Sequence, residues 1–343
     1  MATPAAVPSN RRRLTYIIGG TSLVILAVLG VTLGPVRIGP GAALLEIAGR
    51  VLPLNIHSGL SDQEAAIVWQ LRAPRVVLGS LVGAMLATAG GAYQGVFRNP
   101  LADPYLLGVA AGAGLGATAA LALGGEPGAL PLAAFAGAVM AVGATYYFAR
   151  VAGGRRTAAT LILAGVAVGS FFTAVQTFLQ QQSSDRIREV FTWLLGRLSA
   201  ATWSQVRTVL PYVVAALVVL LAYRRVLDVL SVGEEEAATL GVQPAKARLV
   251  IIAAATLGSA AVVSATGLIG FVGIVVPHAV RMVAGVSYRV ILPLSMVIGA
   301  GFLLAADLLA RMVIPPGELP IGVVTAFVGA PFFAMILRRR QPV

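Results

Sequence analysis

Apolar stretches long enough to cross a bilayer recur along the whole chain and restrict what it can fold into. About 20 apolar residues in a helix span the hydrocarbon core, and a helix pairs its own backbone N–H and C=O groups where water is absent. The stretches lack the alternating polar pattern of a lipid-facing β-strand. We therefore predict an all-α polytopic membrane protein with about ten spans, near residues 14–34, 76–97, 101–124, 129–150, 158–182, 205–223, 245–266, 269–284, 290–313 and 320–337.

Composition supports the membrane assignment and argues against nucleic-acid binding. The chain is 58% hydrophobic and 11% charged, whereas soluble domains carry about 25% charged residues. Its net charge of +12 could by itself indicate a nucleic-acid partner. The basic residues instead lie near the ends of the predicted spans, without the motifs of nucleic-acid recognition, so we interpret them as orientation signals and lipid contacts.

Arginine clusters outside the first and last spans predict the orientation of the chain. Arg11–Arg13 precede the first span and Arg338–Arg340 follow the last, and basic residues favour the cytoplasmic side. We predict two cytoplasmic termini, with a tail over residues 1–13, one transmembrane domain over 14–338 and a tail over 339–343. A cleaved signal peptide is the alternative for the first span, but its long apolar run lacks a convincing small-x-small cleavage site.

The chain lacks the residue groups that most catalytic and metal sites require. It has no cysteine, and its two histidines, His57 and His278, have no carboxylate cluster beside them in the sequence. Its single lysine, Lys246, lies outside any glycine-rich loop, so the chain cannot itself be a P-loop ATPase. We expect no catalytic residue, no metal site and no cofactor bound by this chain.

Asp307 is the clearest ionisable residue inside a predicted span. Arg311 follows one helical turn later, so we predict an i,i+4 ion pair that neutralises both groups near the membrane edge. A buried carboxylate can also relay protons, and that role stays open as an alternative. A proton- or ion-coupled secondary transporter, however, usually carries more buried ionisable residues than this chain does.

Two regions interrupt apolar sequence with glycine and proline. The first is Gly90–Ala117, where Asn99-Pro100 and Asp103-Pro104 must break a helix, and the second is Ala265–Gly285. Broken helices at corresponding positions of two halves indicate a transport pathway between repeats. Tight packing by small residues is the alternative explanation.

The stretch "SVGEEEAATLGV", Ser231–Val242, gathers three consecutive glutamates in a chain with 13 acidic residues. Ser231 followed by Glu234 forms a capping-box pattern, the glutamates suit the first turn of a helix, and Gly241 can end it. We predict a short helix over about Val232–Leu240. A helix under about 12 residues is marginal alone, so it should pack against something larger; a solvated loop helix is the alternative.

Five sequence blocks carry a resemblance to a known family. They are "LRAPRVVLGSLVGAMLATAGGAYQGVFRNPLADPYLLGV", "LILAGVAVGSFF", "LSVGEEEAATLGV", "GLIGFVGIVVPHAVRMVAG" and "PPGELPIGVVTAFVGAPFFAMIL". From about Leu71 to the C-terminus the chain resembles the FecCD-type permeases of bacterial ABC importers for iron-siderophores, haem or vitamin B12. The resemblance implies a homodimer, or a pair of related permeases, with the path on its axis. It also implies two cytoplasmic ATPase subunits and a periplasmic or lipid-anchored substrate-binding protein.

The resemblance also assigns roles to individual residues. ATPase coupling falls in the cytoplasmic connection 224–248, on Ser231, Gly233, Glu234, Glu235, Glu236, Leu240, Gly241 and Val242. The cytoplasmic gate falls on Asn99, Leu101, Thr157 and Thr160. Docking of the binding protein falls on Arg72, Arg75 and Arg311.

These features together predict a permease subunit in the bacterial cytoplasmic membrane that moves an iron chelate by alternating access. A siderophore is the leading cargo, with haem and vitamin B12 behind it. ATP and magnesium would be used by the partner ATPase. The alternatives are an ion- or proton-coupled secondary transporter and a non-transporting membrane scaffold, and a requirement for a separate ATPase separates the first alternative from our prediction.

Overall fold

The computed structural model describes residues 9–52, 57–151, 158–182, 187–315 and 317–339, and within these ranges the ordered elements are all helical. The first half contains α1 (Ser9–Thr32), α2 (Pro40–Val51), α3 (Asp62–Ala66), the π-helix η1 (Ile67–Arg72), α4 (Ala73–Val96), the 3₁₀ turn η2 (Pro104–Leu107), α5 (Val109–Ala122), η3 (Pro127–Ala129), α6 (Leu130–Val151) and α7 (Ala158–Gln182). The second half contains α8 (Ile187–Leu194), α9 (Trp203–Ala222), α10 (Arg224–Val232), α11 (Glu234–Thr239), α12 (Pro244–Thr266), α13 (Val272–Ala284), α14 (Tyr288–Met312) and α15 (Ile321–Arg339).

The predicted spans correspond to helices of this fold. Within the described residues, seven helices are long and apolar enough to cross a membrane, and three shorter apolar helices, α5, α13 and α15, account for the remaining spans. The prediction of an all-α polytopic membrane protein is confirmed. Two of the short helices, α5 and α13, follow the glycine- and proline-rich breaks, because proline and glycine end the preceding helices there.

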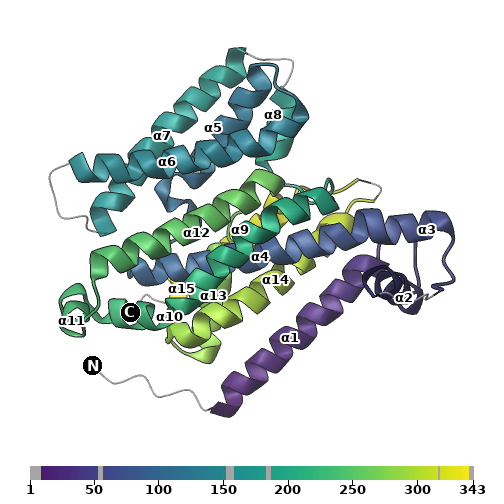
Figure 1. The fold of residues 1–343 in the computed structure, drawn as a ribbon, viewed down its shortest axis with the longest axis horizontal. Helices are drawn as coiled ribbons and strands as arrows, with labels where there is room; N and C mark the ends of the chain where they lie inside the picture. The colour runs from purple at the N-terminus through teal and green to yellow at the C-terminus, as the bar shows by residue number, and fades with distance from the viewer. Residues whose placement is uncertain (1–8, 53–56, 152–157, 183–186, 316, 340–343) are drawn as a thin grey trace.

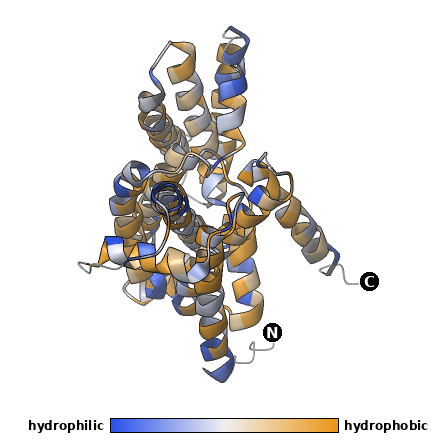
Figure 2. Cartoon of the chain, turned by 90° about the vertical axis from the view of Figure 1, so that its right-hand side faces the viewer, coloured by the Kyte–Doolittle hydropathy of each residue, from blue (hydrophilic) through white to orange (hydrophobic). Residues whose placement is uncertain are grey.

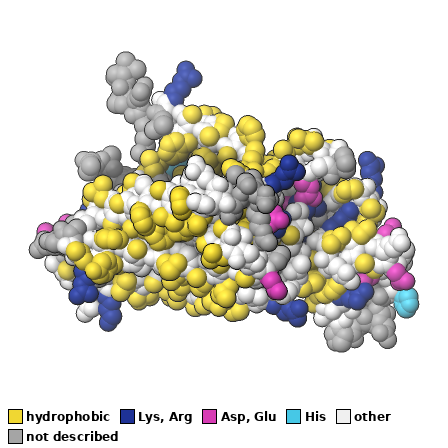
Figure 3. Space-filling view, turned by 90° about the horizontal axis from the view of Figure 1, so that it is seen from above, with side chains coloured by type: hydrophobic (Ala, Val, Ile, Leu, Met, Phe, Trp, Pro, Cys, Tyr) yellow, Lys and Arg dark blue, Asp and Glu magenta, His cyan; other side chains and the backbone are white. Residues whose placement is uncertain are grey.

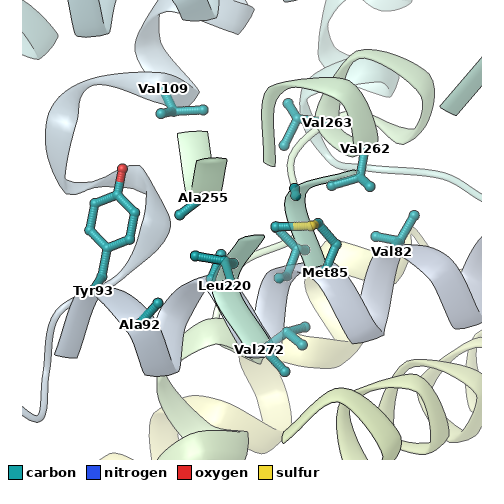
Figure 4. Packing of buried hydrophobic residues seen from close by; sticks show 14 of the residues in the cluster. Val82, Met85, Ala92, Tyr93, Val109, Leu220, Ala255, Val262, Val263 and Val272 are labelled. Atoms are coloured by element: carbon teal, nitrogen blue, oxygen red, sulfur yellow. The ribbon is translucent and has the colours of Figure 1, made fainter. Parts of the chain in front are cut away.

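Helix α4 forms the centre of the bundle, with 21 of its 24 residues buried. It packs against α9, α12, α13 and α14, while α5–α8 form an upper group that contacts α12 and α1 lies along α14 at the lower edge (Figure 1). Figure 4 shows the side chains at this centre, including Met85 and Tyr93 from α4. The Tyr93 hydroxyl lies 2.9 Å from the Thr256 hydroxyl of α12, which satisfies both buried groups.

Backbone-to-backbone crossings hold α4 against its neighbours. A Cβ atom built on Gly83 would lie 2.2 Å from the carbonyl oxygen of Gly299 in α14. A Cβ atom on Gly90 would lie 1.9 Å from the carbonyl oxygen of Gly273 in α13. Small residues at such crossings are typical of membrane helices, where close van der Waals contact replaces the hydrophobic effect as the main attraction.

The two ends of the bundle carry different elements. Helices α10 and α11 lie at the left end of Figure 1, where α1 also begins, and α2 and α3 lie at the right end. Hydrophobic side chains cover most of the face in Figure 3, and charged side chains gather toward the ends. The first helix begins at Ser9, so Arg11–Arg13 belong to its first turns instead of to a tail before residue 14.

The helix that contains α4 begins earlier than predicted. Residues 62–96 form one continuous helical run, started by a capping box in which Ser61 N–H donates to Glu64 at 3.0 Å. Pro74 lies in the first turn of α4, directly after the π-helix η1 and inside the continuous helical run. The π-helical turn immediately before it, in which the Ala73 N–H bonds to Val68, gives the wider backbone that a proline ring requires.

Candidate functional site

The turn that follows α4 holds the predicted gate residues Asn99 and Leu101. Arg98 N–H donates to Gly95 at 3.3 Å and Asn99 N–H donates to Gln94 at 3.2 Å, which together form a Schellman helix end. Arg98 occupies its left-handed position with φ 48°, although it carries a side chain. The Asn99 side chain then accepts from the Leu101 N–H at 3.0 Å, so these two residues form one ordered turn.

The two broken regions predicted from the sequence meet in space. Asp103 caps η2 by accepting from the Tyr105 N–H at 2.8 Å. The Tyr105 hydroxyl donates to the carbonyl of Ile269 at 3.0 Å, and so ties η2 to the break between α12 and α13. The sequence predicted both breaks, but this contact spans 164 positions and left no local signal.

The break between α12 and α13 contains Phe271, which, like Arg98, is a non-glycine residue whose backbone is left-handed. Gly267 has φ 75° and Phe271 has φ 68°. The Phe271 ring lies so close to Gly329 of α15 that a Cβ atom there would approach within 2.4 Å. Non-glycine residues held in this region cost about 1–3 kcal/mol and concentrate at functional sites.

Two grooves adjoin this break and share Leu268. One has a volume of about 610 Å³ and is lined by apolar residues of α8, the break and α15. The other has a volume of about 940 Å³ and lies along η2, α5 and α7. Its polar lining on α7 consists of Ser170, Thr173, Gln176 and Thr177.

Helices α7 and α15 both present large apolar side chains outward. Phe171 and Phe178 of α7 are 65% and 59% exposed, and Phe327 of α15 is 74% exposed. In Figure 2, α15 stands at the right and the group that contains α7 stands at the top. The two grooves therefore open between helices whose outer faces this single chain leaves uncovered.

The remaining gate residues lie at the start of α7. Thr157 lies outside the described residues, and Thr160 is half-buried in the first turn of α7. Further along α7, Gly165 packs directly on η2, where a Cβ atom would lie 2.3 Å from the Leu106 carbonyl oxygen. The turn with Asn99 and Leu101 and the helix with Thr160 are thus linked through η2.

The predicted coupling segment forms two helices and not one. Ser231 lies in the last turn of α10, where its hydroxyl donates to the Asp228 carbonyl at 2.6 Å, so the predicted Ser231–Glu234 capping box is wrong. Inside a helix, a serine hydroxyl can donate to the carbonyl one turn earlier, and Ser231 makes this bond instead of capping the helix that starts at Glu234. Gly233 is the N-cap of α11, which begins at Glu234, and the Glu236 carboxylate folds back over Gly233.

The C-terminal end of α11 matches the prediction. Gly241 has φ 80°, its N–H donates to Ala238 at 3.0 Å, and the Val242 N–H donates to Ala237 at 3.0 Å, which is a Schellman motif. Val242 packs partly against the core. Leu240 is 69% exposed and Glu235 is also exposed, so α11 presents both an apolar and an acidic side chain outward.

The three predicted docking arginines lie inside the protein. Arg72, Arg75 and Arg311 are 6%, 9% and 9% exposed. They are therefore not freely exposed cations, and their role in docking stays a prediction. Arg72 donates to the carbonyls of Val31 and Thr32 at 2.9 and 2.7 Å, where the C-terminal end of the α1 dipole favours a cation.

Arg75 and Arg311 share one buried carboxylate. Arg75 donates to Asp307 at 2.8 Å and to Glu318 at 2.9 Å. Arg311 lies 3.2 Å from Asp307, which confirms the predicted i,i+4 pair, and it also donates to the Gly30 carbonyl at 3.2 Å. This arginine network joins α1, α4, α14 and the loop before α15, and the Arg75 contacts were not predicted.

A bundle of membrane-spanning helices, with broken helices beside two grooves and a capped surface helix at one end, defines a multi-span membrane transport subunit. The chain belongs to the FecCD transport family, which it matches over residues 22–339. It is 41% identical to the cobalamin import system permease protein BtuC of Halobacterium salinarum, over 94% of this chain and 95% of that protein. It is 36% identical to the hemin transport system permease protein HmuU of Yersinia pestis, over 97% and 98% of the two chains.

A solved structure shares the fold. It is an inward-facing conformation of a protein described as a metal-chelate type ABC transporter, with a TM-score of 0.84 and 28% identity over 95% of this chain and 99% of that one. The Fe(3+) dicitrate transport system permease protein FecD of Escherichia coli is 37% identical over 88% of this chain and 96% of its own length. The relatives named here are thus permeases for three different cargos.

Proposed function

We propose that this chain is the permease subunit of a binding-protein-dependent ABC importer for an iron chelate. It moves a large polar cargo by alternating access, and a separate ATPase supplies the energy with ATP and magnesium. The observation that carries this proposal is α11, a capped helix with an exposed Leu240 at one end of a ten-span bundle. A chain without a phosphate-binding loop requires a separate ATPase subunit to drive transport, and α10–α11 offer a surface on which that subunit can dock.

The proposed cargo is an iron-siderophore, with haem and vitamin B12 as alternatives. The names of the relatives support this class of cargo, since they carry cobalamin, hemin and Fe(3+) dicitrate. The groove along α7 supports it too, because hydroxyl and amide groups line it. Such groups can hydrogen-bond to a chelate without trapping it as a fixed charge would.

We further propose a homodimer in the cytoplasmic membrane, with both termini and α10–α11 on the cytoplasmic side. The exposed apolar faces of α7 and α15 support this assembly, since a second copy would cover them and enclose the grooves. The gate then consists of the turn with Asn99 and Leu101 together with Thr157 and Thr160. The connection η2–Tyr105–Ile269 supports a gate that moves with the break between α12 and α13.

The test of this function uses the purified chain with and without its cognate ATPase subunits. Alone in proteoliposomes, the chain is expected neither to hydrolyse ATP nor to accumulate cargo. Adding the ATPase and the binding protein should restore both activities, measured by phosphate release and by uptake of iron-siderophore, haem and vitamin B12 in parallel. ATP hydrolysis by the chain alone, or ATP-independent accumulation driven by an ion gradient, would refute the proposal.

We propose that the coupling residues from Leu230 to Val242 seat in the ATPase, and Gly241 provides the sharpest test. Gly241→Val places a β-branched residue at φ 80°, which costs about 1–2 kcal/mol or more. If that energy falls on docking, ATPase affinity drops roughly 5- to 30-fold in titration by fluorescence. Gly241→Asn is the matched control, because asparagine tolerates this conformation. Equal affinity in both variants would leave α11 as a solvated helix.

We propose that an acidic delivery protein docks at the end that carries the arginine network and competes with Glu318 for Arg75. Glu318 is 37% exposed, so Glu318→Gln removes the outer competitor and leaves Asp307 in place. An exposed ion pair contributes about 0.2–1 kcal/mol, so binding-protein association should strengthen about 1.4- to 5-fold. Asp62→Asn, an exposed carboxylate in α3 at the same end, is the control. Identical effects of both variants in surface-binding kinetics would reject docking at Arg75.

A further inference from the structure

Helix α10 carries Asp228, whose carboxylate holds the start of α14. One carboxylate oxygen accepts from the Tyr288 N–H at 2.6 Å, and the other accepts from the Ser287 hydroxyl at 2.9 Å. Ser287 is the N-cap of α14, but its side chain makes no capping bond within its own helix. Asp228 therefore supplies the cap of α14 from a different helix, and its charge lies at the positive end of the α14 dipole.

The same turn of α10 contacts the end of α4. Leu227 is fully buried, and its Cδ2 atom would lie 2.8 Å from a Cβ atom on Gly95. The Tyr288 ring covers Gly95 from the other side, at 3.0 Å from the same position. Gly95 in turn accepts from Arg98 in the turn that leads to Asn99. The contacts of α10 thus reach α14 directly and reach the proposed gate through α4.

Helix α11 contacts the membrane-spanning helices less extensively than α10 does. Helix α11 packs on α10 and on the start of α12, and Val232 and Leu240 point outward. The large buried side chains of the segment, Leu227 and Leu230, belong to α10, whereas α11 buries the small Ala237. Movement of α11 can therefore reach the membrane-spanning helices through α10 as well as through the start of α12.

We propose that Asp228 is the positioning residue that joins α10 to α14 and transmits movement of the coupling segment into the bundle. Without the hydrogen bonds to Ser287 and Tyr288 and the 3.6 Å ion pair with Arg289, α10 can slide along the end of α14, and the movement is lost. The inference rests on the proposed function, because it assumes that the ATPase acts on α10–α11. A cap that only stabilised α14 would affect stability without changing how efficiently ATP hydrolysis drives transport.

The experiment measures cargo transported per ATP hydrolysed in proteoliposomes that hold the permease, its ATPase and its binding protein. Asp228→Ala should leave ATPase association unchanged and lower this ratio about 2- to 30-fold, the range that corresponds to coupling energies of roughly 0.5–2 kcal/mol. Asp62→Ala is the control, because it removes an exposed carboxylate from α3, at the opposite end of the bundle from α10. Asp228→Asn keeps one acceptor for Tyr288 and should give an intermediate ratio.

A covalent rescue separates transmission from simple capping. The chain has no cysteine, so the double variant Asp228→Cys/Ser287→Cys carries a unique thiol pair. Joining the pair with a short bifunctional thiol reagent should restore most of the ratio, although it returns no acceptor to the Tyr288 N–H. A capping role alone predicts no recovery. If Asp228→Ala does not assemble, the asparagine and cross-linked variants provide the same comparison.

The outcomes distinguish this inference from the proposed function. A normal ratio in Asp228→Ala with normal ATPase association overturns the inference and leaves the permease function standing. Loss of ATPase association in Asp228→Ala also overturns it, since Asp228 would then belong to the docking surface. Failure of the unmodified chain to bind or use any ATPase would overturn the proposed function and this inference with it.

Discussion

Asp307→Ala is expected to lower the free energy of unfolding by about 3–5 kcal/mol, because it leaves two buried arginines without their shared carboxylate. Asp307 is 1% exposed and contacts both Arg75 and Arg311. A single-domain protein is stabilised by only about 5–15 kcal/mol, so much of the protein should fail to assemble. The measurement is unfolding in mixed micelles followed by tryptophan fluorescence.

Two further variants identify the cause of this loss. Asp62→Ala removes an exposed carboxylate at the same end of the molecule and should change stability by less than about 0.5 kcal/mol. Arg75→Met/Asp307→Leu removes a buried cation together with the carboxylate and should recover part of the loss, since replacing both members of a buried pair by apolar groups is often neutral. If Asp307→Ala were as stable as Asp62→Ala, the arginine network would not hold these helices together.

Gly90→Ala is expected to destabilise the protein by about 1–3 kcal/mol, the usual cost of overpacking. The added Cβ atom would lie 1.9 Å from the Gly273 carbonyl oxygen, and both groups belong to backbones that cannot rotate away. Helices α4 and α13 would have to separate at the crossing next to η2, so transport should fall as well. Thermal unfolding and cargo uptake together measure the effect.

The matched control for Gly90 is Gly143 in α6, a helical glycine with open space around its Cβ position. Gly143→Ala should stabilise the protein by about 0.5–1 kcal/mol, since alanine loses less backbone entropy in a helix than glycine does. The two substitutions make the same chemical change and should have opposite signs. Equal effects would mean that helix propensity, and not the α4–α13 crossing, determines the cost at Gly90.

The residues that the sequence assigned correctly are those whose structure depends on near neighbours. Long apolar stretches become helices in a membrane because each helix satisfies its own backbone. Asp307 and Arg311 pair because they lie one turn apart, and Gly241 ends α11 because a glycine costs least in a left-handed cap. The prolines around Asn99 end α4 for a similarly local reason. The sequence alone also carried the family resemblance, through blocks that keep their order along the chain.

Contacts between distant segments decided the rest. Arg75 meets Asp307 across 232 positions, so a sequence pattern marks Arg75 as an external cation while the fold buries it. Ser231 has the right spacing to cap α11, but α10 continues through it because Leu227 and Leu230 pack into the bundle. Asp228 caps α14 across 60 positions, and nothing near it in the chain predicts that partner. Local hydrogen bonds and dihedral preferences follow from adjacent residues, whereas the partner of a buried charge depends on which helices the packing brings together.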